Sequence, residues 1–150
     1  MMWPEFDEKG DLPVGIHRGR LAEVLQHFGG GSLRRRLVGQ RLERIYRLAF
    51  GTGQVARFVV YGSFVTAKPS PVDVDVFMVM EDSFGLDQVT GESAIIFDHQ
   101  AAQNVEGASV FWIRRLGAIG GVQAAVEHWQ IKRDKTLRGI VEVISDDSEH

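Results

Sequence analysis

The chain has 150 residues, contains no cysteine and carries a formal net charge of −3. This length suits one domain with a buried core and is too short for two ordinary domains. The absence of cysteine excludes a disulfide framework, a thiolate metal site and a cysteine nucleophile. No apolar run approaches the roughly 20 residues that span a bilayer, and the first 12 residues are acidic, unlike a signal peptide. We therefore expect a cytoplasmic protein that makes no membrane contact.

Three segments are predicted from composition. Residues 1–12 form an extended lead-in, residues 13–144 form the folded domain, and residues 145–150 form an acidic tail. Residues 1–10 and the tail are polar and charged and show no periodicity, so we expect them to bury little surface.

The folded segment is predicted to contain four helices and three strands. In chain order these are a helix over 18–28, a helix from the N-cap Ser32 to about Leu48, strands over 57–61 and 72–80 separated by a loop, a loop and helix over 87–105, a strand over 108–113, a helix over 122–129, and a late strand or helix end over 140–144. This order predicts an α/β or α+β domain in which a small mixed sheet packs against helices.

The charges are distributed unevenly along the chain. Residues 17–48 hold eight arginines and two glutamates, whereas residues 69–113 hold eight acidic residues and no lysine or arginine. A basic flank facing an acidic middle suits a site where a metal ion and a polyphosphate meet. A solvated, arginine-rich helix surface is the alternative explanation.

Two aspartates on one predicted strand are the candidate metal ligands. On a strand over 72–80, side chains alternate, so Asp73 and Asp75 share one face while Val72, Val74 and Val76 line the other. Two buried, unpaired carboxylates cost several kcal/mol. A divalent cation removes that cost, because Mg²⁺ is typically held by one or two carboxylates together with substrate phosphates.

A glycine–serine turn precedes this strand. Gly62 and Ser63 follow directly on the strand over 57–61. Glycine lets the backbone approach a ligand closely, and a serine hydroxyl with neighbouring N–H groups can hold a phosphate. Lys68 lies in the loop between the turn and the aspartates and can reach a phosphate, although a solvated loop lysine is an equal alternative. We expect the turn and the aspartate pair to converge in one cleft.

These motifs resemble those of a known superfamily. Gly62-Ser63, nine intervening residues, and Asp73-Val74-Asp75 resemble the signature of the nucleotidyltransferases related to DNA polymerase beta. Three further stretches are similar to a compact bacterial group of that superfamily, which includes minimal nucleotidyltransferases of toxin–antitoxin pairs. These stretches are Leu12 to His17, Tyr61 to Thr66 with Lys68-Pro69, and Phe111-Trp112-Ile113.

The resemblance implies an activity and assigns roles to residues. It implies transfer of a nucleoside monophosphate from an NTP, expected to be ATP, to an unidentified acceptor, which is an RNA end, a protein hydroxyl or a small molecule, supported by Mg²⁺ or Mn²⁺. Gly62, Ser63 and Lys68 would bind the nucleotide, and Asp73 and Asp75 would bind the metal and carry catalysis. The implied partner is a cognate toxin or antitoxin protein.

The chain departs from the superfamily pattern at a third carboxylate. That acid usually stands on a neighbouring strand, where it helps to deprotonate the attacking hydroxyl. The strand predicted over 108–113 contains no acid, and Ser109 stands near the expected position. Glu106, Asp98 and Glu142 are weak candidates to replace it.

Two other functions compete with the enzyme. A catalytically degenerate protein that binds a nucleotide or a partner chain is favoured by the missing third acid, whereas the enzyme is favoured by the intact Gly62-Ser63 and Asp73/Asp75 motifs. A nucleic-acid-binding module built on Arg34, Arg35 and Arg36 is the third hypothesis, and a salt-dependent affinity would reveal it.

Overall fold

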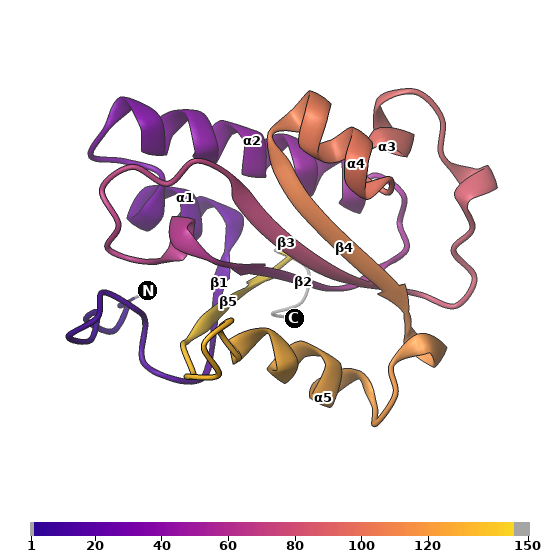
Figure 1. Cartoon of the computed structure of the whole chain (residues 1–150). Helices are drawn as coiled ribbons and strands as arrows, with labels where there is room; N and C mark the ends of the chain where they lie inside the picture. The colour runs from indigo at the N-terminus through magenta and orange to yellow at the C-terminus, as the bar shows by residue number, and fades with distance from the viewer. Residues whose placement is uncertain (1, 146–150) are drawn as a thin grey trace.

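Five strands form one mixed sheet in the order β1-β5-β2-β3-β4 in the computed structural model, which describes residues 2–145 (Figure 1). The strands are β1 (Ile16–Arg20), β2 (Val55–Tyr61), β3 (Val74–Met80), β4 (Ala108–Arg114) and β5 (Ile140–Ile144). Strand β2 runs antiparallel to β3 and β5, while β1 is parallel to β5 and β4 is parallel to β3. The predicted single α/β domain with a small mixed sheet is confirmed.

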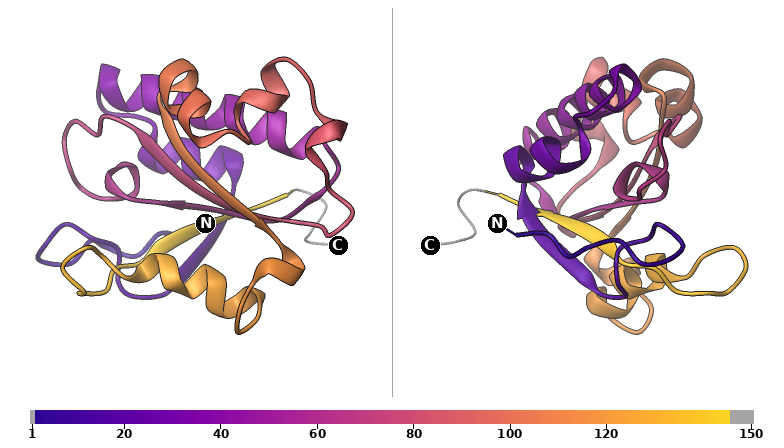
Figure 2. Two further views of the ribbon diagram at one scale, coloured as in Figure 1. Left: turned by 45° about the vertical axis from the view of Figure 1, so that its right-hand side comes forward. Right: turned by 90° about the vertical axis from the view of Figure 1, so that its left-hand side faces the viewer.

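Helices cover both faces of this sheet. The helices are α1 (Leu21–Phe28), α2 (Leu33–Phe50), α3 (Glu92–Ile95), α4 (His99–Ala101) and α5 (Val122–Glu127). Helices α1 and α2 lie on one face and α5 lies on the other (Figures 1 and 2). No helix within residues 2–145 is long and apolar enough to cross a membrane.

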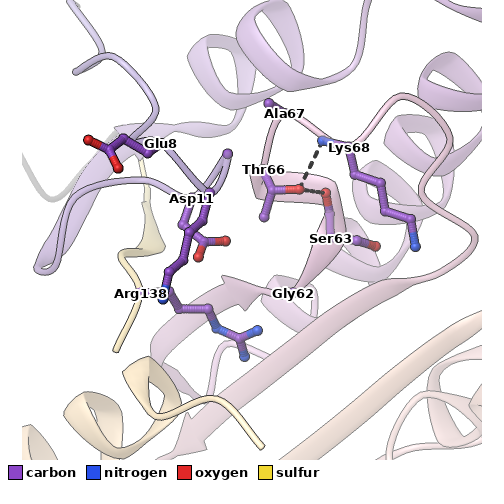
Figure 3. A pocket seen from close by; sticks show the side chains of 10 residues that line it. Glu8, Asp11, Gly62, Ser63, Thr66, Ala67, Lys68 and Arg138 are labelled. Carbon is purple, nitrogen blue, oxygen red and sulfur yellow. Dashed lines mark hydrogen bonds between the residues drawn. The ribbon is translucent and has the colours of Figure 1, made fainter. Parts of the chain in front are cut away.

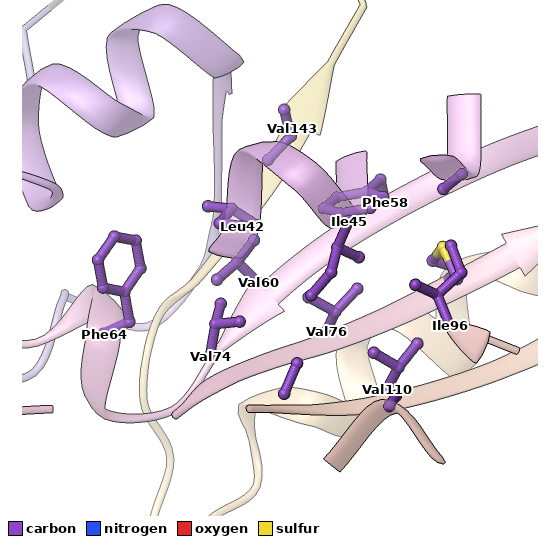
Figure 4. Packing of buried hydrophobic residues seen from close by; sticks show 14 of the residues in the cluster. Leu42, Ile45, Phe58, Val60, Phe64, Val74, Val76, Ile96, Val110 and Val143 are labelled. Carbon is purple, nitrogen blue, oxygen red and sulfur yellow. The ribbon is translucent and has the colours of Figure 1, made fainter. Parts of the chain in front are cut away.

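Alternation along the central strands divides the core into two clusters. Phe58 and Val60 of β2 point toward α1 and α2, where Leu42 and Ile45 are fully buried (Figure 4). Tyr61 of β2 points to the opposite face, together with Val59, Phe77 and Val79 and with Val126 of α5. The face of β3 that carries Asp75 is therefore the face covered by α5.

Helix α2 begins as the sequence predicts. The Ser32 side chain accepts a hydrogen bond from the Arg35 backbone N–H at 3.1 Å, which is the geometry of an N-cap. The predicted strands over 57–61 and 108–113 are likewise present, each slightly longer than expected. The ambiguous segment over 140–144 is the strand β5.

Two predicted boundaries and one predicted helix are wrong. The helix expected from residue 18 begins at Leu21, because residues 16–20 form the edge strand β1 and pair with β5. Strand β3 begins at Val74 instead of Val72, and the Val72 side chain is 59% exposed. The region over 87–105 contains the short helices α3 and α4, where one helix was expected.

The expectation that residues 1–10 bury little surface holds only in part: none of residues 2–10 is fully buried, but two of their aromatic rings pack against the core. Trp3 stacks on His27 with ring centroids 5.4 Å apart and meets the ring of Phe28 edge-on at 5.1 Å. Phe6 packs against the same core cluster, and the backbone oxygen of Gly10 accepts a hydrogen bond from the Ala67 N–H. Of the predicted acidic tail, residues 146–150 lie outside the described residues.

Trp3 is expected to contribute to stability through these contacts. Trp3→Ala removes a half-buried ring from α1, so we expect the free energy of unfolding to fall by roughly 1–3 kcal/mol, less than for a fully buried tryptophan. Met2→Ala is the matched control, because Met2 is 93% exposed. Denaturant titrations of both variants measure the difference, and equal stability of the two variants would contradict the prediction.

Candidate functional site

The candidate site forms where β2 ends beside β3. Tyr61 of β2 pairs with Asp75 of β3, and the chain then turns at Gly62 with φ of 79°. A Cβ atom on Gly62 would lie 2.0 Å from Oδ2 of Asp75. Only glycine therefore fits at this position, both for its backbone conformation and for the space that the carboxylate occupies.

The turn after Gly62 is held from helix α2. The guanidinium group of Arg35 donates hydrogen bonds to the backbone oxygens of Phe64 at 2.8 Å, Thr66 at 2.6 Å and Lys68 at 2.5 Å, and to that of Phe28 at 3.1 Å. Four carbonyl groups from two segments thus converge on one side chain. This arrangement fixes the path of the loop on which Ser63 and Lys68 stand.

These bonds also bear on the nucleic-acid hypothesis. The Arg35 side chain is committed to the interior of the fold, and Arg44 and Arg47 form ion pairs with Glu106 and Glu43. Arg34 and Arg36, the other two arginines of that hypothesis, are exposed, so a nucleic-acid surface on this helix stays a prediction.

A cavity of about 890 Å³, the Asp75 cavity, brings together most of the predicted site residues. Gly62, Ser63, Lys68 and Asp75 all line it. The predicted convergence of the turn with the aspartates therefore holds for Asp75. Asp73 precedes strand β3 and is not among the residues that line the cavity.

A second cavity, of about 620 Å³, also borders the turn and is called here the N-terminal cavity (Figure 3). Glu8, Lys9, Gly10 and Asp11 form one wall of it. Gly62, Ser63, Lys68 and Arg138 line both cavities. The wall is anchored by the buried Asp11 carboxylate, which accepts a hydrogen bond from Lys132 Nζ at 2.9 Å.

The Asp75 carboxylate is unpaired in its folded environment. Within the described part of the chain it accepts no hydrogen bond and forms no ion pair, although it is half-buried. Burial, together with the negative charge of Asp73, raises the pKa of Asp75 to about 6, while Arg138 and Arg133 oppose the shift. The folded protein thus holds a carboxylate that lacks a positive partner at close range.

Arg138 supplies positive charge where the two cavities meet. Its guanidinium carbon lies 5.4 Å from the centroid of the Tyr61 ring, and Nη2 is 3.5 Å from the Trp129 backbone oxygen. Its Nε is buried without a hydrogen-bond partner among the described residues. Lys68 Nζ and Ser63 Oγ likewise have no hydrogen-bond partner within residues 2–145. These groups can together receive an anionic oxygen-rich ligand.

None of the three candidates for a third carboxylate joins Asp75. Both Glu106 oxygens accept hydrogen bonds from Arg44 Nε, at 3.0 and 2.8 Å. Glu142 is paired with Arg57 and Arg18. The Asp98 side chain caps α4 by accepting the Ala101 N–H at 2.9 Å.

Ser109 occupies the position expected for that acid. The parallel register of β3 and β4 places Ser109 directly opposite Asp75, and both residues line the Asp75 cavity. Asp134 also lines the cavity, but its Oδ1 accepts hydrogen bonds from the backbone and the hydroxyl of Thr136. No local sequence pattern singles out Asp134, Arg138 or His99, which the tertiary fold brings to the cavity.

A divalent cation held at this site would need ligands from a substrate as well as from the protein. No group of three or more His, Asp or Glu side chains within residues 2–145 is placed to hold a metal ion without other ligands. Asp75, with Asp73 two residues before it, offers carboxylate oxygens that lack protein partners. Mg²⁺ is commonly held by one or two carboxylates with substrate phosphates completing the shell, so these residues fit Mg²⁺ or Mn²⁺.

The fold and the cavity define a single-domain α/β protein with a five-stranded mixed sheet and a half-buried carboxylate beside a glycine–serine turn. Residues 4–144 match a family described as a family of unknown function, DUF6932, and the chain belongs to this family. The matched residues include the N-terminal segment from Pro4 and all five strands. No curated protein and no solved structure matches the chain.

Gly62→Ala is expected to disrupt both the turn and Asp75. The added methyl group would overlap Oδ2 of Asp75, and the positive φ would be strained. Gly53→Ala is the matched control, because Gly53 has φ of 70° but an added methyl group there would meet nothing within 4 Å. We expect Gly53→Ala to cost about 1 kcal/mol and Gly62→Ala at least about 2 kcal/mol more. Thermal unfolding of the two variants at one pH tests the difference, and equal losses would contradict it.

Asp75→Asn is expected to stabilise the protein in a pH-dependent way. The folded pKa of Asp75, about 6, lies above its ordinary value of 3.8, so the native state binds the proton more tightly than the unfolded state. Stability from this group is therefore present at low pH and is lost as the pH rises through about 6. Asp75→Asn removes this charge, so it should raise the free energy of unfolding by about 1–3 kcal/mol near pH 7.5 and change it little near pH 4.

Asp134→Asn provides a control of opposite sign. Hydrogen bonds from Thr136 lower the pKa of Asp134, so loss of its charge should not stabilise the protein at neutral pH. Unfolding free energies measured across this pH range check both variants. A stability of Asp75→Asn equal to that of the wild type at neutral pH would show that the carboxylate costs nothing.

Proposed function

We propose that this protein is a Mg²⁺-dependent nucleotidyltransferase that moves a nucleoside monophosphate from an NTP, with ATP as the first candidate, to a hydroxyl group of an RNA or protein acceptor. The observation that carries the proposal is the approach of the unpaired Asp75 carboxylate to Gly62, with Ser63 and Lys68 in the same cavity. Such a site pairs oxygen ligands for a cation with donors for a polyphosphate. The superfamily resemblance of the motifs supports the same function.

Different residues of the site would bind the phosphate chain of the NTP and the metal ion. Ser63 Oγ and Lys68 Nζ lie on the turn fixed by Arg35 and would hold the phosphate chain. Arg138, where the two cavities meet, would contact the same chain from the side of the N-terminal cavity. When bound, Mg²⁺ or Mn²⁺ would neutralise phosphate charge and orient the reacting group. Asp75 and Asp73 are the residues that would hold it.

A degenerate, non-catalytic protein that binds a nucleotide or a partner chain is the second candidate. The observation in its favour is Ser109, which stands opposite Asp75 where a third acid is expected. The resemblance to the compact bacterial nucleotidyltransferases supports a cognate toxin or antitoxin as the partner, both for the enzyme and for the degenerate binding protein. The cytoplasmic location predicted from the sequence suits both, since both need access to NTP and Mg²⁺.

Melting curves with each NTP, in the presence of Mg²⁺ or Mn²⁺, test nucleotide binding. At an NTP concentration about 100 times the Kd, ligand binding should raise the free energy of unfolding of the wild-type protein by about 2.7 kcal/mol. This gain corresponds to a rise in Tm of roughly 5–10 °C for a chain of this size. Asp75→Asn and Asp73→Asn should lower the affinity tenfold or more, because Mg²⁺ loses an anionic ligand. Asp87→Asn, on an exposed 3-10 turn outside both cavities, should keep the full shift.

Transfer of label from an α-labelled NTP to protein or RNA separates the two candidates. A shift accompanied by labelled product and pyrophosphate supports the enzyme. A shift without transfer supports the degenerate binding protein. Absence of any shift with every NTP, or a full shift in both aspartate variants, would exclude the metal-dependent site.

A further inference from the structure

His99 is held on the same sheet face as Asp75. It is the first residue of α4, and its ring stacks on Phe111 of β4 with centroids 4.4 Å apart and planes 25° apart. Phe111 in turn stacks on Trp129 at 5.4 Å. Ser109 and Phe111 are two positions apart on β4, so both side chains point to the face that carries Asp75. His99, Phe111 and Asp75 accordingly line the one Asp75 cavity.

The hydrogen bond of His99 fixes which ring nitrogen can accept a proton. Nδ1 lies 3.2 Å from the backbone oxygen of Val110. A carbonyl oxygen can only accept, so the neutral ring carries its proton on Nδ1 and presents a free lone pair on Nε2. Nε2 has no hydrogen-bond partner within residues 2–145. The ring is exposed to solvent, into which a proton can leave.

The other groups of the cavity that could act as a base either have another role or have no hydrogen bond that fixes their orientation. Asp75 is a candidate metal ligand, and Asp134 accepts two hydrogen bonds from Thr136. His128 meets Trp129 edge-on, but no hydrogen bond to its ring within the described residues selects a tautomer. Oriented imidazole nitrogens are common general bases because their charge changes near neutral pH.

We propose that His99 is the general base for the acceptor hydroxyl, in place of a carboxylate at position 109; this inference rests on the proposed nucleotidyl transfer. Nε2 removes the hydroxyl proton as the hydroxyl oxygen bonds to the α-phosphorus of the NTP. The bond from that phosphorus to the oxygen bridging the α- and β-phosphates breaks, and its electron pair leaves on pyrophosphate. The imidazolium then releases the proton to solvent.

His99→Gln tests the proposal, because glutamine keeps a donor for the Val110 oxygen but provides no base. Turnover of label transfer should fall about 100-fold or more, while KM for the NTP and the Mg²⁺-dependent melting shift stay unchanged. Added imidazole should restore part of the turnover of His99→Gly, in which the ring is replaced by space. His27→Gln is the matched control and should keep full turnover, because His27 lies against Trp3 and outside both cavities.

The outcomes separate this inference from the proposed function. If wild-type protein transfers no label, nucleotidyl transfer itself fails and His99 has no role as a base. If wild-type protein is active and His99→Gln keeps its turnover, only the role of His99 is overturned. Loss of the melting shift together with turnover in His99→Gln would make His99 a binding residue. A larger loss of turnover in His128→Gln than in His99→Gln would assign the base to the other imidazole.

Discussion

The candidate site depends on the close approach of the Asp75 carboxylate to the Gly62 backbone, where β2 ends and β3 begins. The Tyr61–Asp75 pair sets the register of the two strands, and the missing side chain at Gly62 leaves the space that Asp75 Oδ2 occupies. Burial then raises the free energy of the charged carboxylate, since no donor among the described residues compensates it. Replacing this side chain with a neutral one is therefore expected to stabilise the protein when no ligand is bound.

The turn that faces this carboxylate is rigid for a reason that lies in another element. Arg35 of α2 satisfies backbone oxygens of Phe64, Thr66 and Lys68, which a short irregular loop could not pair within itself. Burial lowers the pKa of Arg35, a sign that the guanidinium group gives up hydration to make these bonds. Lysine could not replace it, because a single ammonium group lacks the planar set of donors that reaches several carbonyl groups at once.

The Asp75 cavity is lined both by a carboxylate and by stacked aromatic rings. Asp75, Gly62 and Ser63 line it together with the rings of His99, Phe111 and Trp129, and Trp129 also packs against Tyr61, the strand partner of Asp75. Serine at position 109 keeps the strand beside Asp75 free of a second negative charge, which would raise the pKa of Asp75 still further. In the proposed mechanism, His99 would take the role of that acid without adding a negative charge beside Asp75. The separation of metal binding from proton removal is thus compatible with the absence of a third acid.

The sequence by itself determined the features that depend on near neighbours in the chain. These include the Ser32 cap of α2, the apolar strands β2, β3 and β4, and the pairing of a Gly62-Ser63 turn with Asp75 on the next strand. Only the tertiary structure decided which of the basic and acidic residues remain available for a ligand. Arg18 and Glu142 are 124 positions apart and pair only once β1 lies beside β5. The free energy of such contacts depends on chain closure and burial, which local periodicity does not encode. For the same reason, the packing of Trp3 on α1 and the position of His99 beside β4 could not be predicted from the sequence.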